Sequence, residues 1–107
     1  MPWLVRDTEV LASVELADGR AARSKGLLGR DDFDGVLRLE ARSVHTFGMR
    51  FPVDVAFCDT DGTVRRVLTM VPWRVSRPHL APTVVYEASA GTFRDCNLRP
   101  GDRLELQ

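Results

Sequence analysis

Short runs of alternating apolar and polar residues, separated by glycine, proline and aspartate, make up most of the chain. Such alternation places successive side chains on opposite faces of a β-strand. It predicts seven strands, at residues 10–16, 35–39, 45–51, 53–58, 64–71, 83–88 and 103–106.

The two strands around Pro52 carry the clearest pattern. In the first, one face is predicted to hold His45, Phe47, Met49 and Phe51. In the second, Val53, Val55 and Phe57 share one face, and Asp54, Ala56 and Cys58 share the other. The larger apolar side chains are expected to form an inner wall of the protein.

The connections between the strands are rich in turn formers. A short helix of about two turns is predicted at residues 20–28, weakened at its centre by Gly26. The stretch "DTDG" at 59–62 predicts a hairpin turn, and "AGTFRDCNL" at 90–98 a turn or short helix. Three prolines exclude residues 72–82 from a central strand.

Together these elements predict one domain, residues 1–107, with a mainly β fold. About six to seven short strands with one or two short helices favour a compact antiparallel β-sandwich or a distorted barrel.

Composition narrows the function classes. The 15 basic and 15 acidic residues cancel, so no overall field attracts the chain to nucleic acid or to an anionic membrane. The chain starts without an apolar leader and has no stretch of membrane-spanning length, so we expect a soluble, cytoplasmic protein. Cys58 and Cys96 have no second cysteine at metal-ligand spacing, and are expected to be buried thiols rather than a disulfide.

Asp54 is the most informative candidate for a functional side chain. Its neighbours on the same strand face, Ala56 and Cys58, are small and not charged. A carboxylate there must lie at a rim or have a partner, because burying an isolated charge is costly. Thr46 and Arg50 would reach it if the two strands paired. A structural salt bridge and a ligand-binding carboxylate both stay open.

Glu87 is the only acid in residues 62–94. Residues 62–86 carry four arginines, a histidine and Trp73, which would suit an anion or a nucleic-acid strand. A solvated loop is the interpretation that we favour, because two arginine pairs on a turn-rich loop form no continuous basic stripe.

Signatures of the common enzyme classes are missing from the chain. It has no nucleophile elbow, phosphate-binding loop, dinucleotide fingerprint, zinc pair or deaminase motif. We therefore assign no catalytic residue and predict no cofactor and no metal.

Three segments, in the same order, resemble motifs of one family. They are "RSKGLLGR" at 23–30, "HTFGMRFPVDVAFCDTDG" at 45–62, and "VVYEASAGTF" followed by "RPGDRLEL" near the end. The chain resembles the uncharacterised ancient-conserved-region family, domain of unknown function 192, over nearly its whole length. The resemblance implies a compact β-rich fold and no particular reaction. Many members resemble exported or lipid-anchored proteins, a feature that this chain's start does not share.

Four of the matching positions are charged where packing alone would not require it: Arg23, Arg30, Asp54 and Glu87. The leading hypothesis is a non-catalytic binding module with a polar cleft around Asp54 and Glu87, taking a small polar ligand or a peptide. One alternative is a small hydrolase or lyase that uses Asp54 and Glu87 as an acid–base pair. Another is an assembly module whose strand edge pairs with a protein partner or a second copy.

The "DTDG" turn should not bind calcium. Asp59 and Asp61 match the start of a calcium loop, but the further oxygen ligands and the bidentate glutamate are missing. Isothermal titration calorimetry with millimolar calcium should give no saturable heat. A one-to-one binding isotherm would contradict this interpretation.

Overall fold

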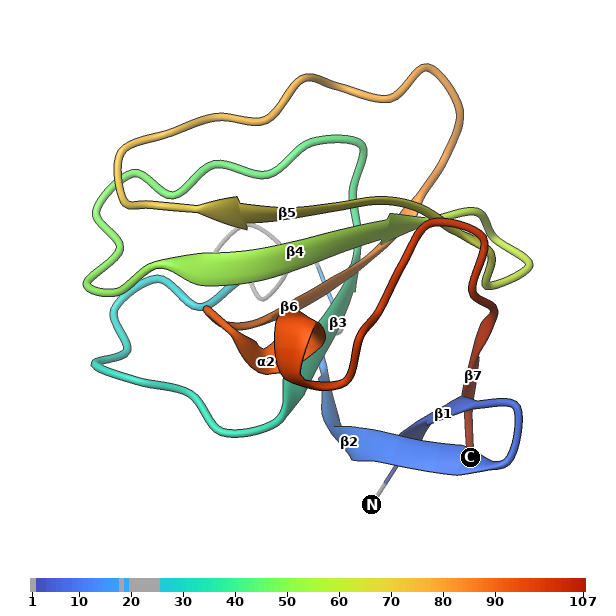
Figure 1. The fold of residues 1–107 in the computed structure, drawn as a ribbon. Helices are drawn as coiled ribbons and strands as arrows, with labels where there is room; N and C mark the ends of the chain where they lie inside the picture. Colours follow the sequence, from blue (N-terminus) through green and yellow to red (C-terminus); the bar gives the residue numbers. More distant parts are fainter. Residues whose placement is uncertain (1, 18, 20–25) are drawn as a thin grey trace.

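Seven strands and one short helix make up the regular structure of the residues described in the computed structural model, which are 2–17, 19 and 26–107 (Figure 1). The strands are β1 (Trp3–Arg6), β2 (Glu9–Leu16), β3 (Val36–Glu40), β4 (Val53–Cys58), β5 (Val64–Met70), β6 (Val84–Ser89) and β7 (Leu104–Leu106). The helix is α2 (Thr92–Asp95). The predicted mainly β fold with short strands is confirmed.

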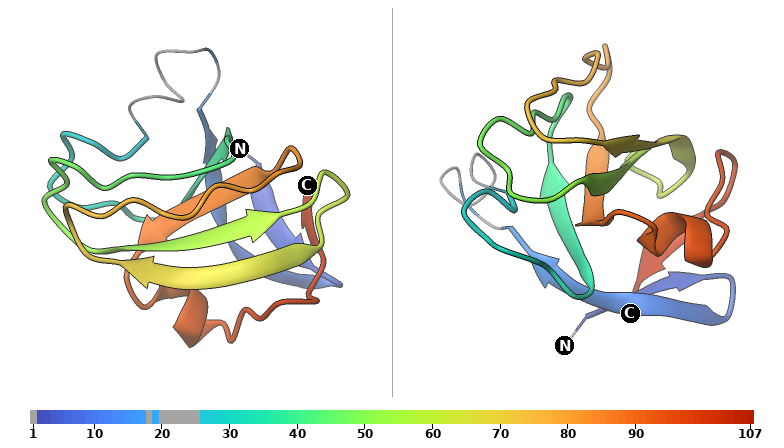
Figure 2. Two further views of the ribbon diagram at one scale, coloured as in Figure 1. Left: turned by 90° about the horizontal axis from the view of Figure 1, so that it is seen from above. Right: turned by 60° about the vertical axis from the view of Figure 1, so that its left-hand side comes forward.

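The strands form one strongly curved sheet in the order β5-β4-β6-β3-β2-β1-β7 (Figure 2). All neighbours are antiparallel except β2 and β3, which pair in parallel. The two edges meet at the hairpin turn, where Val64 N–H donates to the Asp102 carbonyl and Leu104 N–H to the Gly62 carbonyl. A Cβ at Gly62 would lie 2.2 Å from the Leu104 carbonyl oxygen, so only glycine permits this approach. The sheet is therefore a distorted barrel that stays open along most of its edges.

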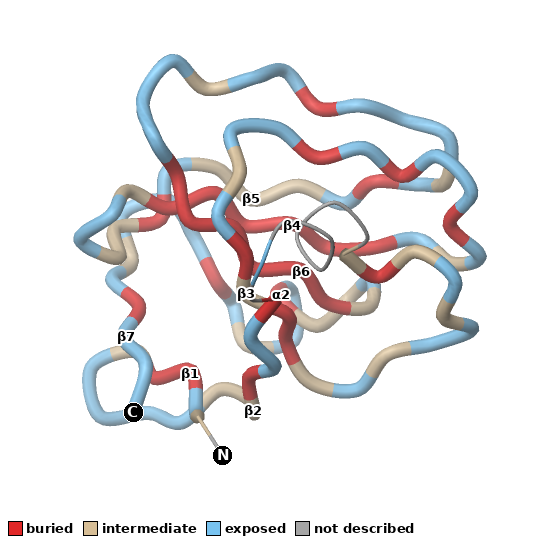
Figure 3. The backbone as a smooth tube through the Cα atoms, turned by 180° about the vertical axis from the view of Figure 1, so that it is seen from behind, coloured by how far each residue is buried: buried red, intermediate tan, exposed pale blue. Residues whose placement is uncertain are grey.

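Strand β4 is buried along its whole length, and so are the first five residues of β6 (Figure 3). The alternation predicted for β4 is confirmed. Val53, Val55 and Phe57 pack into one apolar cluster, and Ala56 and Cys58 pack into another on the opposite face. Each of these five side chains is thus buried in one of two apolar clusters.

The strand predicted at residues 45–51 is wrong. Only His45 makes a bridge, to Val75, and the chain then turns, with Met49 N–H donating to the Thr46 carbonyl at 3.1 Å. Gly48 has φ +77°, a left-handed conformation that interrupts an extended chain. Phe47 consequently points outward, 45% exposed, while Met49 is buried, so the two side chains do not share a face.

Near the N-terminus, the structure has one strand that the sequence pattern did not predict. Strand β1 was not predicted, because Leu4 and Val5 are both buried and its four residues show no alternation. The helix predicted at residues 20–28 lies mainly outside the described residues, and its described part, 26–28, belongs to a turn.

The proline-rich segment 72–82 lies outside the sheet, as predicted, but is tied to residues 42–46 beside it (Figure 1). Backbone hydrogen bonds join Thr46 to Arg74, Ser76 to Val44, and His79 to Arg42. The two segments together form a cover over one face of the sheet.

Both cysteines of the chain are free thiols. Cys58 is buried, and burial raises its pKa to about 12. Cys96 is half-buried. Within the described part of the chain, no helix is long and apolar enough to cross a membrane.

Asp54 is 2% exposed and has three hydrogen-bond donors. One carboxylate oxygen accepts from the Thr69 hydroxyl at 2.7 Å. The other accepts from the backbone N–H groups of Gly91 and Phe93, at 2.9 and 3.0 Å, and so caps the start of α2. Asp54 therefore joins β4, β5 and α2.

The partners predicted for Asp54 from the sequence are wrong. The Thr46 hydroxyl donates to the Val71 carbonyl, and the Arg50 guanidinium pairs with Asp31 at 2.5 Å. Because residues 45–51 turn away from β4, neither side chain reaches the carboxylate. No salt bridge to Asp54 forms within the described residues.

Replacing Asp54 with asparagine should lower the free energy of unfolding by about 2–4 kcal/mol. The amide has one acceptor oxygen in place of two, so at least one buried donor loses a charged acceptor. Urea denaturation measures the change. Asp31→Asn is the control and should cost less than about 1 kcal/mol, since its ion pair is exposed. A similarly small loss at Asp54 would contradict its structural role.

Candidate functional site

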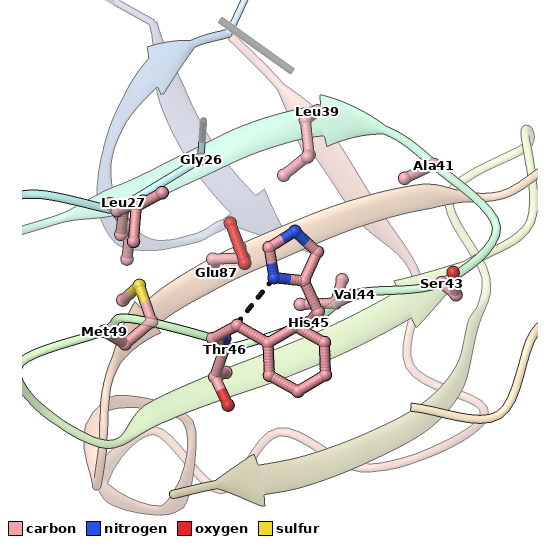
Figure 4. Close-up of a pocket in the computed structure, with 12 residues that line it drawn as sticks. Gly26, Leu27, Leu39, Ala41, Ser43, Val44, His45, Thr46, Met49 and Glu87 are labelled. Carbon is pink, nitrogen blue, oxygen red and sulfur yellow. Dashed lines mark hydrogen bonds between the residues drawn. The ribbon is translucent and has the colours of Figure 1, made fainter. Parts of the chain in front are cut away.

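A cavity of about 230 Å³ lies between the sheet and the segments 26–28 and 41–49. Figure 4 shows the side chains that surround it. Among the described residues, the lining consists of Gly26, Leu27, Leu28, Leu39, Ala41, Ser43, Val44, His45, Thr46, Phe47, Met49 and Glu87. Drug-sized ligands occupy sites of about 300 Å³ or more, so this cavity suits a small molecule or a single side chain.

Glu87 is the acidic residue of this lining. It lies in β6 opposite Leu37 of β3 and Val55 of β4, so its side chain shares a face with apolar neighbours. The side chain is 5% exposed, and its Oε1 atom has no hydrogen-bond partner in the described part of the chain. Burial raises the pKa of the carboxyl to about 7. Near neutral pH, the group can therefore donate or accept a proton inside the cavity.

Gly26 closes over the Glu87 carboxyl. A Cβ at this position would lie 2.9 Å from Glu87 Oε1, and the backbone has φ +52°. A larger residue would both strain the backbone and push the carboxyl aside. Gly26 of the first sequence motif thus packs directly against Glu87 of the third.

The cavity opens beside a cluster of rings. The His45 and Phe47 rings stack at 5.2 Å between centroids, and Phe47 lies 6.2 Å from the Trp73 ring. Phe47 is 45% and Trp73 65% exposed. Trp73 also has φ +68°, which is costly for an aromatic residue. The protein therefore displays large rings to solvent beside the cavity, which we call the aromatic rim (His45, Phe47 and Trp73).

Of the three sequence candidates that the structure describes, Asp54, Arg30 and Glu87, only Glu87 lines this cavity. Asp54 pairs with Ala88, whereas Val55 pairs with Glu87, so the two carboxyls point to opposite faces of the sheet. Arg30 binds Glu15 through two hydrogen bonds of 2.5 and 3.2 Å and covers the Phe33 ring. Arg23 lies outside the described residues.

Sequence reasoning missed several site residues because it placed them in a strand. Phe47 and Met49 were both interpreted as an inner wall, yet Met49 lines the cavity and Phe47 belongs to its exposed mouth. Gly48 is the one signal in the sequence that could have indicated the turn between them. No group of three His, Cys, Asp or Glu side chains in residues 2–17, 19 and 26–107 could hold a metal ion.

The raised pKa of Glu87 predicts a pH-dependent stability. A carboxyl whose pKa rises from 4.5 to about 7 on folding favours the fold while it is protonated, below pH 4.5. That contribution is lost as pH rises towards 7, on the order of 3 kcal/mol in all. Glu87→Gln should therefore be more stable than the parent protein at pH 8 and similar to it near pH 4.5.

Urea denaturation of both proteins from pH 4.5 to pH 8 measures this difference. Glu40→Gln, which removes an exposed acid from β3, is the control and should differ by about 0.5 kcal/mol or less at either pH. A pH-independent difference between Glu87→Gln and the parent would show that the carboxyl is solvated.

The sequence profile and the sequence relatives that match this chain all belong to uncharacterised protein families. The sequence profile of DUF192, described as "Uncharacterized ACR, COG1430", matches residues 4–106. A UPF0127 protein of Pyrococcus abyssi is 33% identical over 98 residues, which cover 86% of this chain and 84% of that protein. A UPF0127 protein of Pyrococcus furiosus is 31% identical over 108 residues, covering 95% and 93%.

Two crystal structures have the same fold. A proposed transcription regulator from Sinorhizobium meliloti 1021 matches with a TM-score of 0.78 at 29% identity, covering 97% of this chain and 90% of that chain. A protein of unknown function from Novosphingobium aromaticivorans DSM 12444 has a TM-score of 0.82 at 22% identity, covering 97% and 82%. The chain belongs to the DUF192 family, as its three motifs indicated.

Proposed function

We propose that the protein is a non-catalytic binding module whose site is the cavity around Glu87. One observation carries this proposal: a carboxyl that is 5% exposed and unpartnered among the described residues borders an open cavity. A buried polar group without a partner is costly, and native proteins rarely keep one without a role. A ligand that hydrogen-bonds Glu87 would offset this cost.

The remainder of the cavity supports a small ligand or the side chain of a peptide. Leu27, Leu39, Val44 and Met49 give it apolar walls, and its polar residues in the described lining are Ser43, His45, Thr46 and Glu87. Such a site gains affinity from its apolar walls and specificity from one polar contact. Asp54 has no part in this site, because its oxygens are already occupied on the opposite face.

The other functions considered have less support. An acid–base pair of Asp54 and Glu87 is not favoured, because the β4–β6 register separates the two side chains. Nucleic acid is also not favoured, despite the printed name of the Sinorhizobium relative. The net charge is zero, and within the described part of the chain five arginines pair with acids: Arg6, Arg30, Arg50, Arg65 and Arg94. The two free thiols are consistent with a reducing compartment such as the cytoplasm.

A ligand screen by nuclear magnetic resonance tests the proposal. The ¹⁵N-labelled protein is titrated with amino acids, monosaccharides, short alcohols and short alkylamines, each at millimolar concentration. We expect at least one class to shift the backbone amide signals of Leu39, His45, Met49 and Glu87 together.

Ala41→Phe, which places a ring in the cavity, should abolish these shifts. Thr60→Phe, which places the same ring on the exposed hairpin turn, should leave them unchanged. Shifts that persist in Ala41→Phe, or that map to other residues, would contradict the proposal.

A further inference from the structure

We infer that the Glu87 cavity binds a primary alkylammonium group, either of a free amine or of a lysine side chain. The inference rests on the proposed function and names its ligand class. It follows from the charge inside the cavity, from the shape of its apolar walls and from the rings at its mouth.

The first reason is electrostatic. Among the described residues, the elements around the Glu87 carboxyl present apolar or neutral side chains to this face: Leu37 and Leu39 on β3, Val53 and Val55 on β4, and residues 26–28. His45 is the only other titratable residue of the described lining, and no ion pair joins it to Glu87. A cation that enters would therefore supply a counter-charge that no described residue gives Glu87. Coulomb attraction and charge-assisted hydrogen bonds are both stronger in such a poorly solvated place.

The second reason is the apolar wall. An alkyl stem would lie against Leu27, Leu39, Val44 and Met49 while its ammonium reaches the carboxyl. The Thr46 hydroxyl cannot serve a competing polar ligand, because it already donates to the Val71 carbonyl and accepts from Arg74 N–H. Ser43 and His45 are the other polar residues of the described lining, and a single charged head on an apolar stem fits both the carboxyl and the apolar walls.

The third reason is the aromatic rim. The faces of aromatic rings attract cations. Phe47 lines the cavity, Trp73 lies beside the Phe47 ring, and both are substantially exposed. Arg42 and Arg74 lie in the neighbouring segments and would repel a cation, but both are exposed to water, where ions screen the repulsion. An anionic ligand would instead meet the Glu87 carboxylate. The arrangement favours a cation over an anion.

Titration with n-butylammonium, followed by nuclear magnetic resonance, tests the inference against two probes of similar size, 1-pentanol and pentanoate. At pH 8 butylammonium should bind at least about tenfold more tightly than either probe, since one buried charge contact gives this much discrimination. Glu87→Gln should remove most of the preference for the amine over the alcohol. Glu40→Gln, in which an exposed acid is neutralised, should retain it.

The pH dependence gives a second readout. With a Glu87 pKa of about 7, the ionised fraction rises from about one-tenth at pH 6 to about nine-tenths at pH 8, so amine affinity should rise about tenfold. The affinity for 1-pentanol should not rise over this range.

The possible outcomes separate the two proposals. Equal binding of alcohol and amine at the cavity would overturn the ammonium inference and leave the binding module intact. If none of these three probes shifts the cavity residues, the ammonium inference fails, and the wider ligand screen decides on the binding module. If the amine is preferred, comparison with the peptide acetyl-Gly-Gly-Lys-Gly-Gly-amide identifies the source. Tighter binding of the peptide indicates a lysine side chain, and weaker binding indicates a free amine.

Discussion

The pairing of β4 with β6 determines on which face of the sheet Asp54 and Glu87 each lie. Both strands are buried, and their register sets Asp54 beside Ala88 and Val55 beside Glu87. Because side chains alternate, each face of this pair receives one carboxyl. A slip of one residue would bring Val53 and Val55 to the helix side and Asp54 to the cavity side. The two large apolar clusters, one on each face, make such a slip very unfavourable.

The two buried acids show how differently one fold can treat the same chemical group. Asp54 accepts three hydrogen bonds, two of them from the start of α2, and so behaves as part of the framework. Glu87 is almost as buried but keeps an oxygen without a partner among the described residues. The first arrangement contributes to stability, and the second reduces it as Glu87 ionises. This contrast is the reason why we propose a binding site at Glu87 and not at Asp54.

Some residues of the family motifs line the cavity, and others maintain the framework of the fold. Gly26 and Leu27 of the first, Met49 of the second and Glu87 of the third meet around one cavity. Other motif residues maintain the frame, such as Asp59, which hydrogen-bonds Arg65, and Gly62, which lets β7 approach the hairpin. The cavity thus joins residues from all three motifs that mark the chain as a member of DUF192.

Local pattern alone predicted six of the strands, the "DTDG" turn and a turn or short helix after β6, since strand periodicity and turn chemistry are properties of neighbouring residues. It also identified Glu87 as unusual, an isolated acid in a strand. Only the tertiary structure decided which charged residues meet. Arg30 pairs with Glu15, Asp54 caps the start of α2, and Phe47 points outward before the turn at Gly48. These outcomes depend on strand register and on contacts between distant segments, which no local sequence pattern encodes.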